Sequence, residues 1–216
     1  MILTVDNTDL STTYGMLCVR SQGELDMLKV KKGNTQNYND EHGEDIDLSQ
    51  VFYEPREIQL DFIIKATSNT DFVAKMRDFA AFITAPGLHV LKYPIINRPF
   101  FVYCMGDANL DKLTKWNSAL MAGKFNIKLI EPRPVGRVFS TPQNSILVVS
   151  ITTTSLFKPI EIYWGDGTMT VAAAGTSVVT THNYTATRAL YYVLVAGDVQ
   201  GSVIVSKSGN LAEITT

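Results

Sequence analysis

The stretch Glu57-Ile58-Gln59-Leu60-Asp61-Phe62-Ile63-Ile64 decides how the first half of this chain folds. Polar and apolar residues alternate along it, which is typical of a β-strand with one buried face. Further on, apolar residues recur at the spacing of one helix face, which predicts an amphipathic helix over residues 70–84. The predicted stripe consists of Phe72, Val73, Met76, Phe79, Ala80 and Ile83.

The ends of this predicted helix carry their own signals. Asn69 or Thr70 can cap the first turn, and Asp71 suits the positive end of the helix dipole. Pro86-Gly87 is expected to stop the helix. The sequence therefore predicts a strand followed by one short helix that packs on the sheet.

Composition excludes several classes of protein. The chain has 216 residues, of which 45% are hydrophobic and 19% charged, and its net charge is −2, as in ordinary globular proteins. Lys and Arg form no long run, which argues against a nucleic-acid or membrane partner. No run of eighteen apolar residues suggests a membrane span, and the first residues lack the pattern of a signal peptide.

The composition changes at the connector Glu131-Pro132-Arg133-Pro134-Val135-Gly136-Arg137. Its prolines make it stiff, and few basic residues follow it. We predict two domains, over residues 1–134 and 138–216. The first combines strands at 3–5, 16–19, 88–93, 100–105 and 125–130 with the helix, and residues 31–49 form a polar loop or an extended arm. The second has short β-rich runs at regular spacing, which indicate an immunoglobulin-like β-sandwich. The predicted fold class is mainly β with one amphipathic helix, followed by that sandwich.

An acidic cluster lies around His42 and Gly43. Several carboxylates on one loop can hold a hard cation such as calcium, but their spacing does not match an EF-hand. A solvated acidic loop is the favoured interpretation. The cluster consists of Asp40, Glu41, Glu44, Asp45 and Asp47.

The motif Trp164-Gly165-Asp166-Gly167-Thr168 is the clearest local signal in the second half. Asp-Gly between β-rich runs favours a tight hairpin turn. Asp166 can also bind a cation, but no partner carboxylate is near in sequence. We therefore predict a structural turn.

No set of catalytic residues can be assembled. His42, His89 and His182 lack metal-site spacing, and Cys18 and Cys104, which we expect to be buried free thiols, lack a CxxC partner. Nucleophile-elbow, P-loop and dinucleotide-binding motifs are absent from the sequence. Asp61 and Asp78 are expected to face solvent rather than to form an acid/base pair. We predict that the chain is not an enzyme and has no catalytic, cofactor-binding or metal-binding residues.

In order and pattern, residues 50–135 resemble the N-terminal domain of phage distal tail proteins. The resemblance rests on the strand entered by residues 53–60, the helix to Ile83, Gly87-Leu88-His89-Val90-Leu91, the strand 99–104, Trp116 and the closing stretch 123–132. In that family the last strand runs into an acidic or polar residue and a proline, as at Glu131-Pro132.

The second half resembles PKD-type immunoglobulin-like domains. The residues that carry this likeness are 163–168, His182-Asn183-Tyr184 and 192–195. The chain departs from the family pattern in having Trp directly before Gly165, and Arg188-Ala189-Leu190 where a turn glycine is usual. No specific ligand follows from this resemblance.

The first resemblance implies a structural protein of a phage or prophage tail. Copies would form a ring, typically a hexamer, at the distal end of the tail tube and join it to the tip or baseplate proteins. The arm 31–49 would reach a neighbouring copy or the lumen. The sandwich would project outward as an accessory domain that touches host-surface carbohydrate or another tip protein. The alternative is a carbohydrate-binding or adhesion module of a bacterial surface protein, and a metal-dependent hydrolase that uses the acidic loop comes third.

Overall fold

The computed structural model describes residues 1–32, 35–36, 42, 45–46, 51–116, 119–142, 146–152, 159–173, 177–184, 190–197, 204–208 and 211–214. Strands dominate, and two helices accompany them, so the predicted mainly-β fold class is confirmed. The elements are β1 (Thr4–Val5), β2 (Thr8–Asp9), α1 (Leu10–Tyr14), β3 (Met16–Gln22), β4 (Thr35–Gln36), β5 (Asp45–Ile46), β6 (Arg56–Ala66), α2 (Asn69–Ile83), β7 (His89–Lys92), β8 (Phe100–Lys112), β9 (Met121–Glu131), β10 (Gly136–Pro142), β11 (Ile146–Thr152), β12 (Ile160–Tyr163), β13 (Met169–Ala172), β14 (Ser177–Asn183), β15 (Leu190–Gly197), β16 (Ile204–Ser208) and β17 (Ala212–Ile214).

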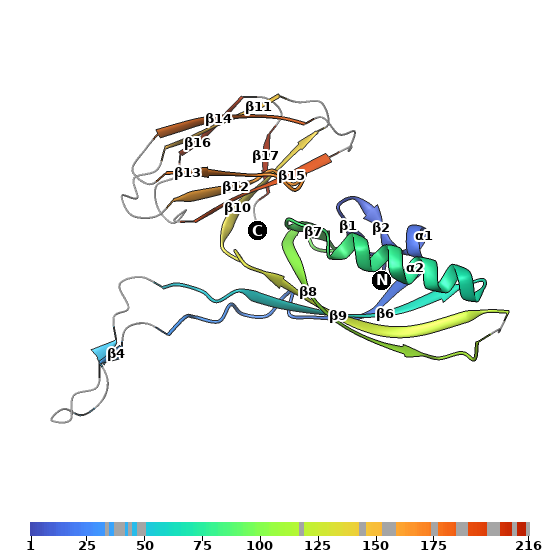
Figure 1. Cartoon of the computed structure of the whole chain (residues 1–216). Helices are drawn as coiled ribbons and strands as arrows, with labels where there is room; N and C mark the ends of the chain where they lie inside the picture. Colours follow the sequence, from blue (N-terminus) through green and yellow to red (C-terminus); the bar gives the residue numbers. More distant parts are fainter. Residues whose placement is uncertain are drawn as a thin grey trace.

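The N-terminal region, residues 1–134, is built on one seven-stranded antiparallel sheet. Its strand order is β2-β1-β7-β8-β9-β6-β3, and α2 lies across one face of it (Figure 1). The central pair β6 and β9 keeps an unbroken register from Arg56↔Glu131 to Ala66↔Met121. β8 continues past the predicted residue 105 to Lys112, because a register shift between Cys104 and Ala108 lets the strand resume its pairing with β9.

The alternation predicted for β6 is observed. Ile58, Leu60, Phe62 and Ile64 are buried beneath α2, whereas the intervening Gln59 is exposed on the opposite face. The buried stripe of α2 is narrower than predicted. Phe72, Phe79 and Ile83 are buried, but Val73 and Ala80 are exposed, because each lies one position, or about 100°, beyond a residue that faces the sheet.

The helix packs closely on β9. Phe79 lies 5.8 Å from the ring of Phe125, which in turn stacks on Phe62 at 5.3 Å. Gly123 makes room for the first turn, since a Cβ at this position would lie 2.9 Å from the Cζ of Phe72. Aromatic packing between α2, β6 and β9 therefore forms the centre of this core.

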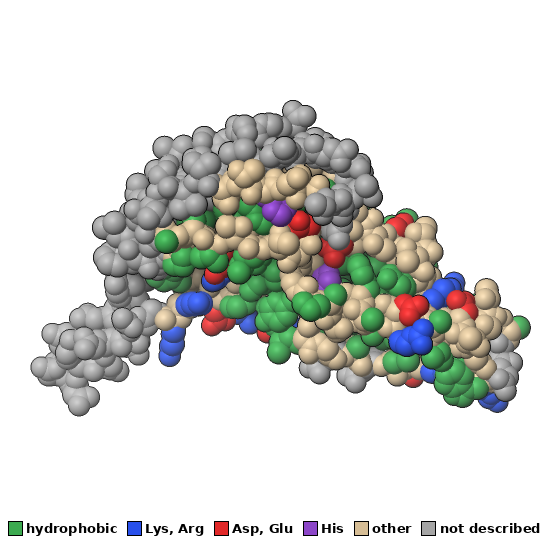
Figure 2. Space-filling model, turned by 45° about the horizontal axis from the view of Figure 1, so that its top comes forward, with side chains coloured by type: hydrophobic (Ala, Val, Ile, Leu, Met, Phe, Trp, Pro, Cys, Tyr) green, Lys and Arg blue, Asp and Glu red, His purple; other side chains and the backbone are tan. Residues whose placement is uncertain are grey.

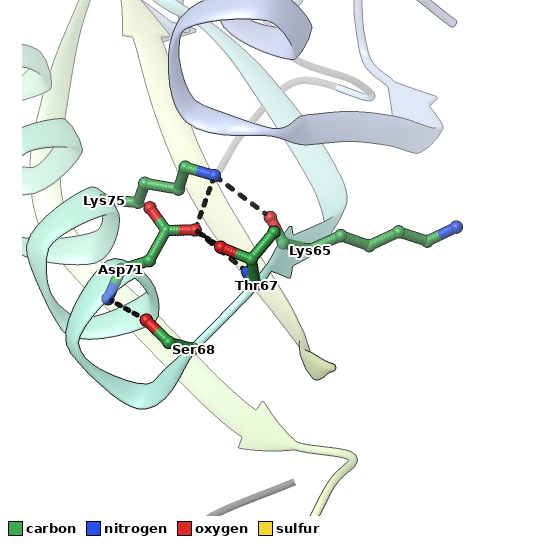
Figure 3. A network of polar contacts seen from close by, with 5 residues as sticks. All are labelled: Lys65, Thr67, Ser68, Asp71 and Lys75. Atoms are coloured by element: carbon green, nitrogen blue, oxygen red, sulfur yellow. Dashed lines mark hydrogen bonds and ion pairs between the residues drawn. The ribbon is translucent and has the colours of Figure 1, made fainter. Parts of the chain in front are cut away.

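Ser68, and not the predicted Asn69 or Thr70, caps α2 (Figure 3). Its hydroxyl accepts a hydrogen bond from the backbone N–H of Asp71 at 3.1 Å. The Asp71 carboxylate accepts from the backbone N–H of Thr67 at 3.0 Å and pairs with Lys75 at 3.0 Å. The Thr67 bond, followed by the Lys75 bond, holds the pKa of Asp71 below its ordinary value. Ser68 is favoured because its extended backbone lets the side chain turn back over the first turn.

In the segment predicted as a loop or an extended arm, the described strand β4 lies beyond the end of the sheet (Figure 1). Its described parts are paired. Lys31 N–H donates to Phe52 O at 2.7 Å, and further out Thr35 lies opposite Ile46. The described residues of this segment are therefore joined by antiparallel pairing, as an extended arm would be.

The C-terminal sandwich consists of β10 to β17. A five-stranded sheet has the order β13-β12-β15-β10-β17, and a three-stranded sheet has the order β14-β11-β16. The two sheets form separate layers (Figure 1). Two of these strands, β10 and β17, were not predicted from the sequence. They pair with each other, and β10 also pairs with β15 along its whole length.

The strand β15 is buried on both faces. One side of the five-stranded sheet contributes Tyr191, Val193 and Val195 to the core of the sandwich. The other side contributes Tyr192 and Leu194 to a cluster shared with the N-terminal region. The sandwich therefore packs against the N-terminal region through this shared cluster.

Candidate functional site

Apolar side chains of the two regions pack against each other at the junction between them. Val90 and Phe101 of the N-terminal sheet are buried against Val138, Tyr192 and Leu194 of the sandwich. Burying apolar surface on both sides stabilises one relative placement of the two regions. The junction is therefore a packed core.

Hydrogen bonds between the two regions accompany this apolar core. Asn7, in a left-handed conformation with φ 64°, donates from Nδ2 to Leu190 O at 2.7 Å. Lys92 Nζ donates to the Tyr192 hydroxyl at 2.6 Å and lies 5.3 Å from the centre of that ring. These contacts connect the turn between β1 and β2, and the strand β7, to the same strand β15.

A buried histidine supports the turn that carries Asn7. Nδ1 of His89 lies 2.8 Å from the Asp6 carboxylate, and Nε2 lies 3.2 Å from Ala85 O. The second Asp6 oxygen accepts from the backbone N–H of Val90 at 2.8 Å. Both ring nitrogens of His89 therefore lie within hydrogen-bond distance of an oxygen. We did not predict this pair, because Asp6 and His89 are far apart in the sequence.

A second buried charge lies where β9 ends. Glu131 has no exposed side-chain surface, and its carboxylate lies 3.1 Å from Nη2 of Arg98 and 3.6 Å from Nε of Arg56. Arg98 also donates to Pro134 O at 2.8 Å, which holds the connector to the sandwich. Burial raises the pKa of Glu131 to about 6, although Arg98 and Arg56 act to lower it. Glu131 and Arg98 therefore fix the point where β9 passes into the connector.

A cleft of about 410 Å³ opens between the two regions. It is lined mainly by apolar groups, including Leu88, Phe101, Tyr163 and Met169. Hydrophobic side chains also gather in a band where the sandwich meets the N-terminal region (Figure 2). The cleft offers apolar contact and two tyrosine rings, and nothing in its described lining is a catalytic acid, base or metal ligand set.

The Trp164–Thr168 motif forms the predicted turn. Gly165 and Gly167 have φ 77° and 92°, and the Asp166 carboxylate accepts from the Thr168 backbone at 3.0 Å. The sequence analysis missed that Asp166 also contacts His182 Nε2 at 2.8 Å. Burial tends to raise the pKa of Asp166, but these hydrogen bonds outweigh it and lower the pKa. The Asp166 carboxylate is therefore engaged by hydrogen bonds within the sandwich.

The aromatic residues of this motif are also internal. The His182 ring stacks on Trp164 at 4.6 Å, and Trp164 is 1% exposed. Tyr184 donates its hydroxyl to Trp164 O at 2.9 Å and stacks on Tyr191. Because Trp164 and Tyr184 are buried, neither presents a flat platform to a ligand.

Of the acidic cluster, Asp40, Glu41, Glu44 and Asp47 lie outside the described residues, while Asp45 begins β5 and His42 is exposed. Within the described part of the chain no group of three His, Cys, Asp or Glu side chains could hold a metal ion.

Asp78 is exposed as predicted, and Asp61 is half-buried. Cys18 is a buried free thiol, and Cys104 is a half-buried one. The described helices include none long and apolar enough to cross a membrane.

The chain was compared with known proteins. No family model matches it, and no curated protein matches its sequence. Among solved structures it is similar to the Dit (gp 19.1) protein of SPP1, described as a paradigm of the hub adsorption apparatus in phages that infect Gram-positive hosts. The identity is 11%, the match covers 92% of this chain and 99% of that one, and the TM-score is 0.49.

Proposed function

We propose that this chain is a structural protein of a phage or prophage tail, which assembles into a ring at the distal end of the tail tube and joins the tube to the tip. The observation that carries the proposal is the N-terminal region. It has the succession of strand, helix and three further strands that the family resemblance implies, in a sheet covered by one helix. In this proposal residues 1–134 form the ring, and residues 138–216 are an accessory unit.

The distribution of side chains supports assembly rather than catalysis. The buried polar groups Glu131 and His89 are engaged in holding the fold together. Large apolar side chains are instead exposed at both ends of the N-terminal sheet, among them Met27 and Trp116. Exposed apolar patches of this kind mark contact surfaces between proteins. The arm gives such a ring a means to reach a neighbouring copy or the lumen.

The junction supports a fixed role for the sandwich. An accessory unit whose core is shared with the ring-forming region keeps one orientation, so six copies in a hexamer would present six equivalent outer surfaces. A further tip protein or host carbohydrate would bind an outer surface of the sandwich. The buried Trp164 and Tyr184 would take no part in such binding.

The proposal is tested on the particles of the phage or prophage that encodes the chain. Mass spectrometry of purified virions should detect the protein, and gold-labelled antibodies should bind at the distal end of the tail. Interrupting the gene should yield tails without a tip. Virions that lack the protein, or labelling of the capsid, would refute the proposal.

A further inference from the structure

The end of the β8–β9 hairpin carries more positive than negative charge. Residues 108–127 contain three lysines and a single carboxylate, that of Asp111. The start of α2, which packs on this hairpin, adds no net charge because Asp71 is paired with Lys75 at 3.0 Å. The positive charge of the hairpin is therefore not cancelled by its neighbour in the fold.

Strand β6 brings a fourth lysine to this end. Lys65 lies opposite Ala122 of β9, two positions along that strand from Lys124, and therefore on the same face of the sheet. Of the three hairpin lysines, Lys115 and Lys124 are exposed and Lys112 is half-buried, and Lys65 is exposed as well. We call these four lysines the basic hairpin end.

Apolar side chains accompany the lysines. Leu113 is 56% exposed, and Trp116 and Leu120 are each 54% exposed. Lys112 Nζ lies 4.0 Å from the centre of the Trp116 ring, so that ammonium group and indole form one surface. Exposed apolar groups beside positive charge suit a protein partner that is rich in carboxylates.

The arm carries the opposite charge. Between Lys32 and Arg56 the sequence contains no lysine or arginine, whereas residues 40–47, which we call the acidic arm segment, contain five carboxylates. Asp45 and Ile46 are its described strand, β5, so the segment offers an apolar side chain as well as charge. The chain therefore contains a partner whose charge complements the basic hairpin end. The five carboxylates are those of Asp40, Glu41, Glu44, Asp45 and Asp47.

The two charged surfaces belong to opposite ends of the same strands. β6 begins at Arg56, where it follows the arm, and ends beside the hairpin at Ala66, opposite Met121. Its eleven residues span about 35 Å at the usual rise of a strand, several times the Debye length of about 8 Å at physiological salt. The described arm strand β4 lies past one end of the sheet, and the hairpin ends of β8 and β9 lie at the other (Figure 1). A contact between the two surfaces therefore joins two copies.

We propose that the acidic arm segment of one copy docks on the basic hairpin end of the next copy. This inference rests on the proposed ring and names a contact that holds it together. Opposite charges attract the two surfaces as the copies approach, and Trp116 adds an apolar contact beside Lys112. Because the surfaces differ, the contact is heterologous: each copy gives one arm and receives another, and a closed series of such contacts is a ring.

Charge reversal in the full chain tests the contact. The hairpin variant, Lys65→Glu with Lys115→Glu, reverses two charges of the basic hairpin end. The arm variant, Asp45→Lys with Asp47→Lys, reverses two charges of the acidic arm segment. Association measured by analytical ultracentrifugation and native mass spectrometry should weaken about 10-fold or more in each variant, because attraction is replaced by repulsion.

A matched control reverses two positive charges elsewhere on the N-terminal region. Arg20→Glu with Arg77→Glu changes exposed residues of β3 and α2. This control should associate like the unaltered protein. Circular dichroism should show the same fold in all three variants, since every described residue that is changed in the hairpin variant and the control is exposed.

Mixing the hairpin variant with the arm variant identifies which surfaces meet. The hairpin variant keeps an intact acidic arm segment, and the arm variant keeps an intact basic hairpin end. One sound contact can therefore form between the two proteins. The mixture should yield one-to-one complexes with the affinity of the unaltered contact, although each variant alone associates weakly.

Salt tests the same contact without any substitution. Raising the ionic strength from about 0.1 M to about 1 M shortens the Debye length from about 10 Å to about 3 Å. Association of the unaltered protein should weaken about 10-fold or more over this interval, because the attraction between the two surfaces is screened.

Four results would overturn the inference. They are association of the unaltered protein no tighter than about 1 mM, association that salt leaves unchanged, a control impaired as strongly as the variants, and a mixture that associates no better than its components. Normal assembly of the hairpin variant would also overturn it and would assign these lysines to an anionic partner other than this chain. Detection of the protein in virion tails would still uphold the proposed function in each of these cases.

Discussion

The two regions of this chain have cores of different chemistry. The N-terminal core is filled by aliphatic side chains and phenylalanines beneath one helix, as in the contact of Phe79 with Phe62 and Phe125. At the centre of the sandwich the large aromatic side chains carry hydrogen-bonding groups. Trp164 donates to the Thr170 hydroxyl at 2.9 Å, and Tyr184 donates to Trp164 O. The first core depends mainly on filling volume, and its buried Tyr93 hydroxyl is bonded at its edge to Ser21 at 2.8 Å, whereas the rings at the centre of the sandwich are hydrogen-bonded within the core itself.

The largest expected effect comes from removing volume in the N-terminal core. Phe79→Ala leaves a cavity among Tyr14, Phe62 and Phe125 and should lower the free energy of unfolding by about 3–5 kcal/mol. Urea denaturation followed by circular dichroism measures this loss. The exposed Val73 on the same helix gives the control, because Val73→Ala should stay within about 0.5 kcal/mol. A loss below about 1 kcal/mol for Phe79→Ala would show that this core does not depend on close packing.

A smaller effect is expected from pH at the end of the N-terminal region. The pKa of Glu131 is raised from 4.5 to about 6, first by burial, with Arg98 and Arg56 opposing it. The folded state then binds this proton more tightly than the unfolded state does. The resulting stability is fully present below pH 4.5 and is lost as the pH rises through 6, by about 2 kcal/mol.

Denaturation measured between pH 4.5 and 7 tests this dependence. Glu131→Gln should flatten the curve over that interval, because the amide does not titrate. An identical pH dependence in the two proteins would assign the effect to another group.

Hydrogen bonding in the sandwich core should have an effect of about 1–2 kcal/mol. Tyr184→Phe keeps the stack on Tyr191 but leaves the buried Trp164 carbonyl without its partner. Thermal unfolding followed by tryptophan fluorescence measures the loss. The partly exposed Tyr103 provides a matched control, and Tyr103→Phe should be nearly neutral. Equal behaviour of the two tyrosines would mean that the hydroxyls of the sandwich core are dispensable.

The smallest expected effect concerns the contact between the regions. Asn7→Gly keeps the left-handed conformation but removes the bond to Leu190 O, at a cost of about 0.5–1 kcal/mol. Calorimetry should still give one transition, since the apolar junction remains. Two separate transitions in the variant would show that this single bond, rather than the shared core, couples the regions.

Local patterns predicted the parts of the fold that depend on local physics. The alternation in β6 and the stripe of α2 each reflect one buried face, so both could be found from spacing alone. The helix cap was misplaced by one or two residues, because Ser68, Asn69 and Thr70 are all good caps and only the backbone decides among them.

The junction was missed although its signal was present. Residues 191–196 form a continuous apolar run, and all six are buried. Such a run indicates a strand covered on both faces. What covers the second face depends on Val90 and Phe101, far away in the chain. The grouping of Arg56, Arg98 and Glu131 could not be predicted either, because register and not spacing brings them together.

Burial of β15 on both faces limits which domains can replace the sandwich during evolution. Phe101 is 1% exposed and Val90 4% exposed in the cluster that they form with residues of the sandwich, among them Tyr192 and Leu194. Exchange of the sandwich for an unrelated module by recombination would leave this hydrophobic pair in water. A successful exchange must therefore bring a strand with a matching apolar face, or else alter Val90 and Phe101 at the same time.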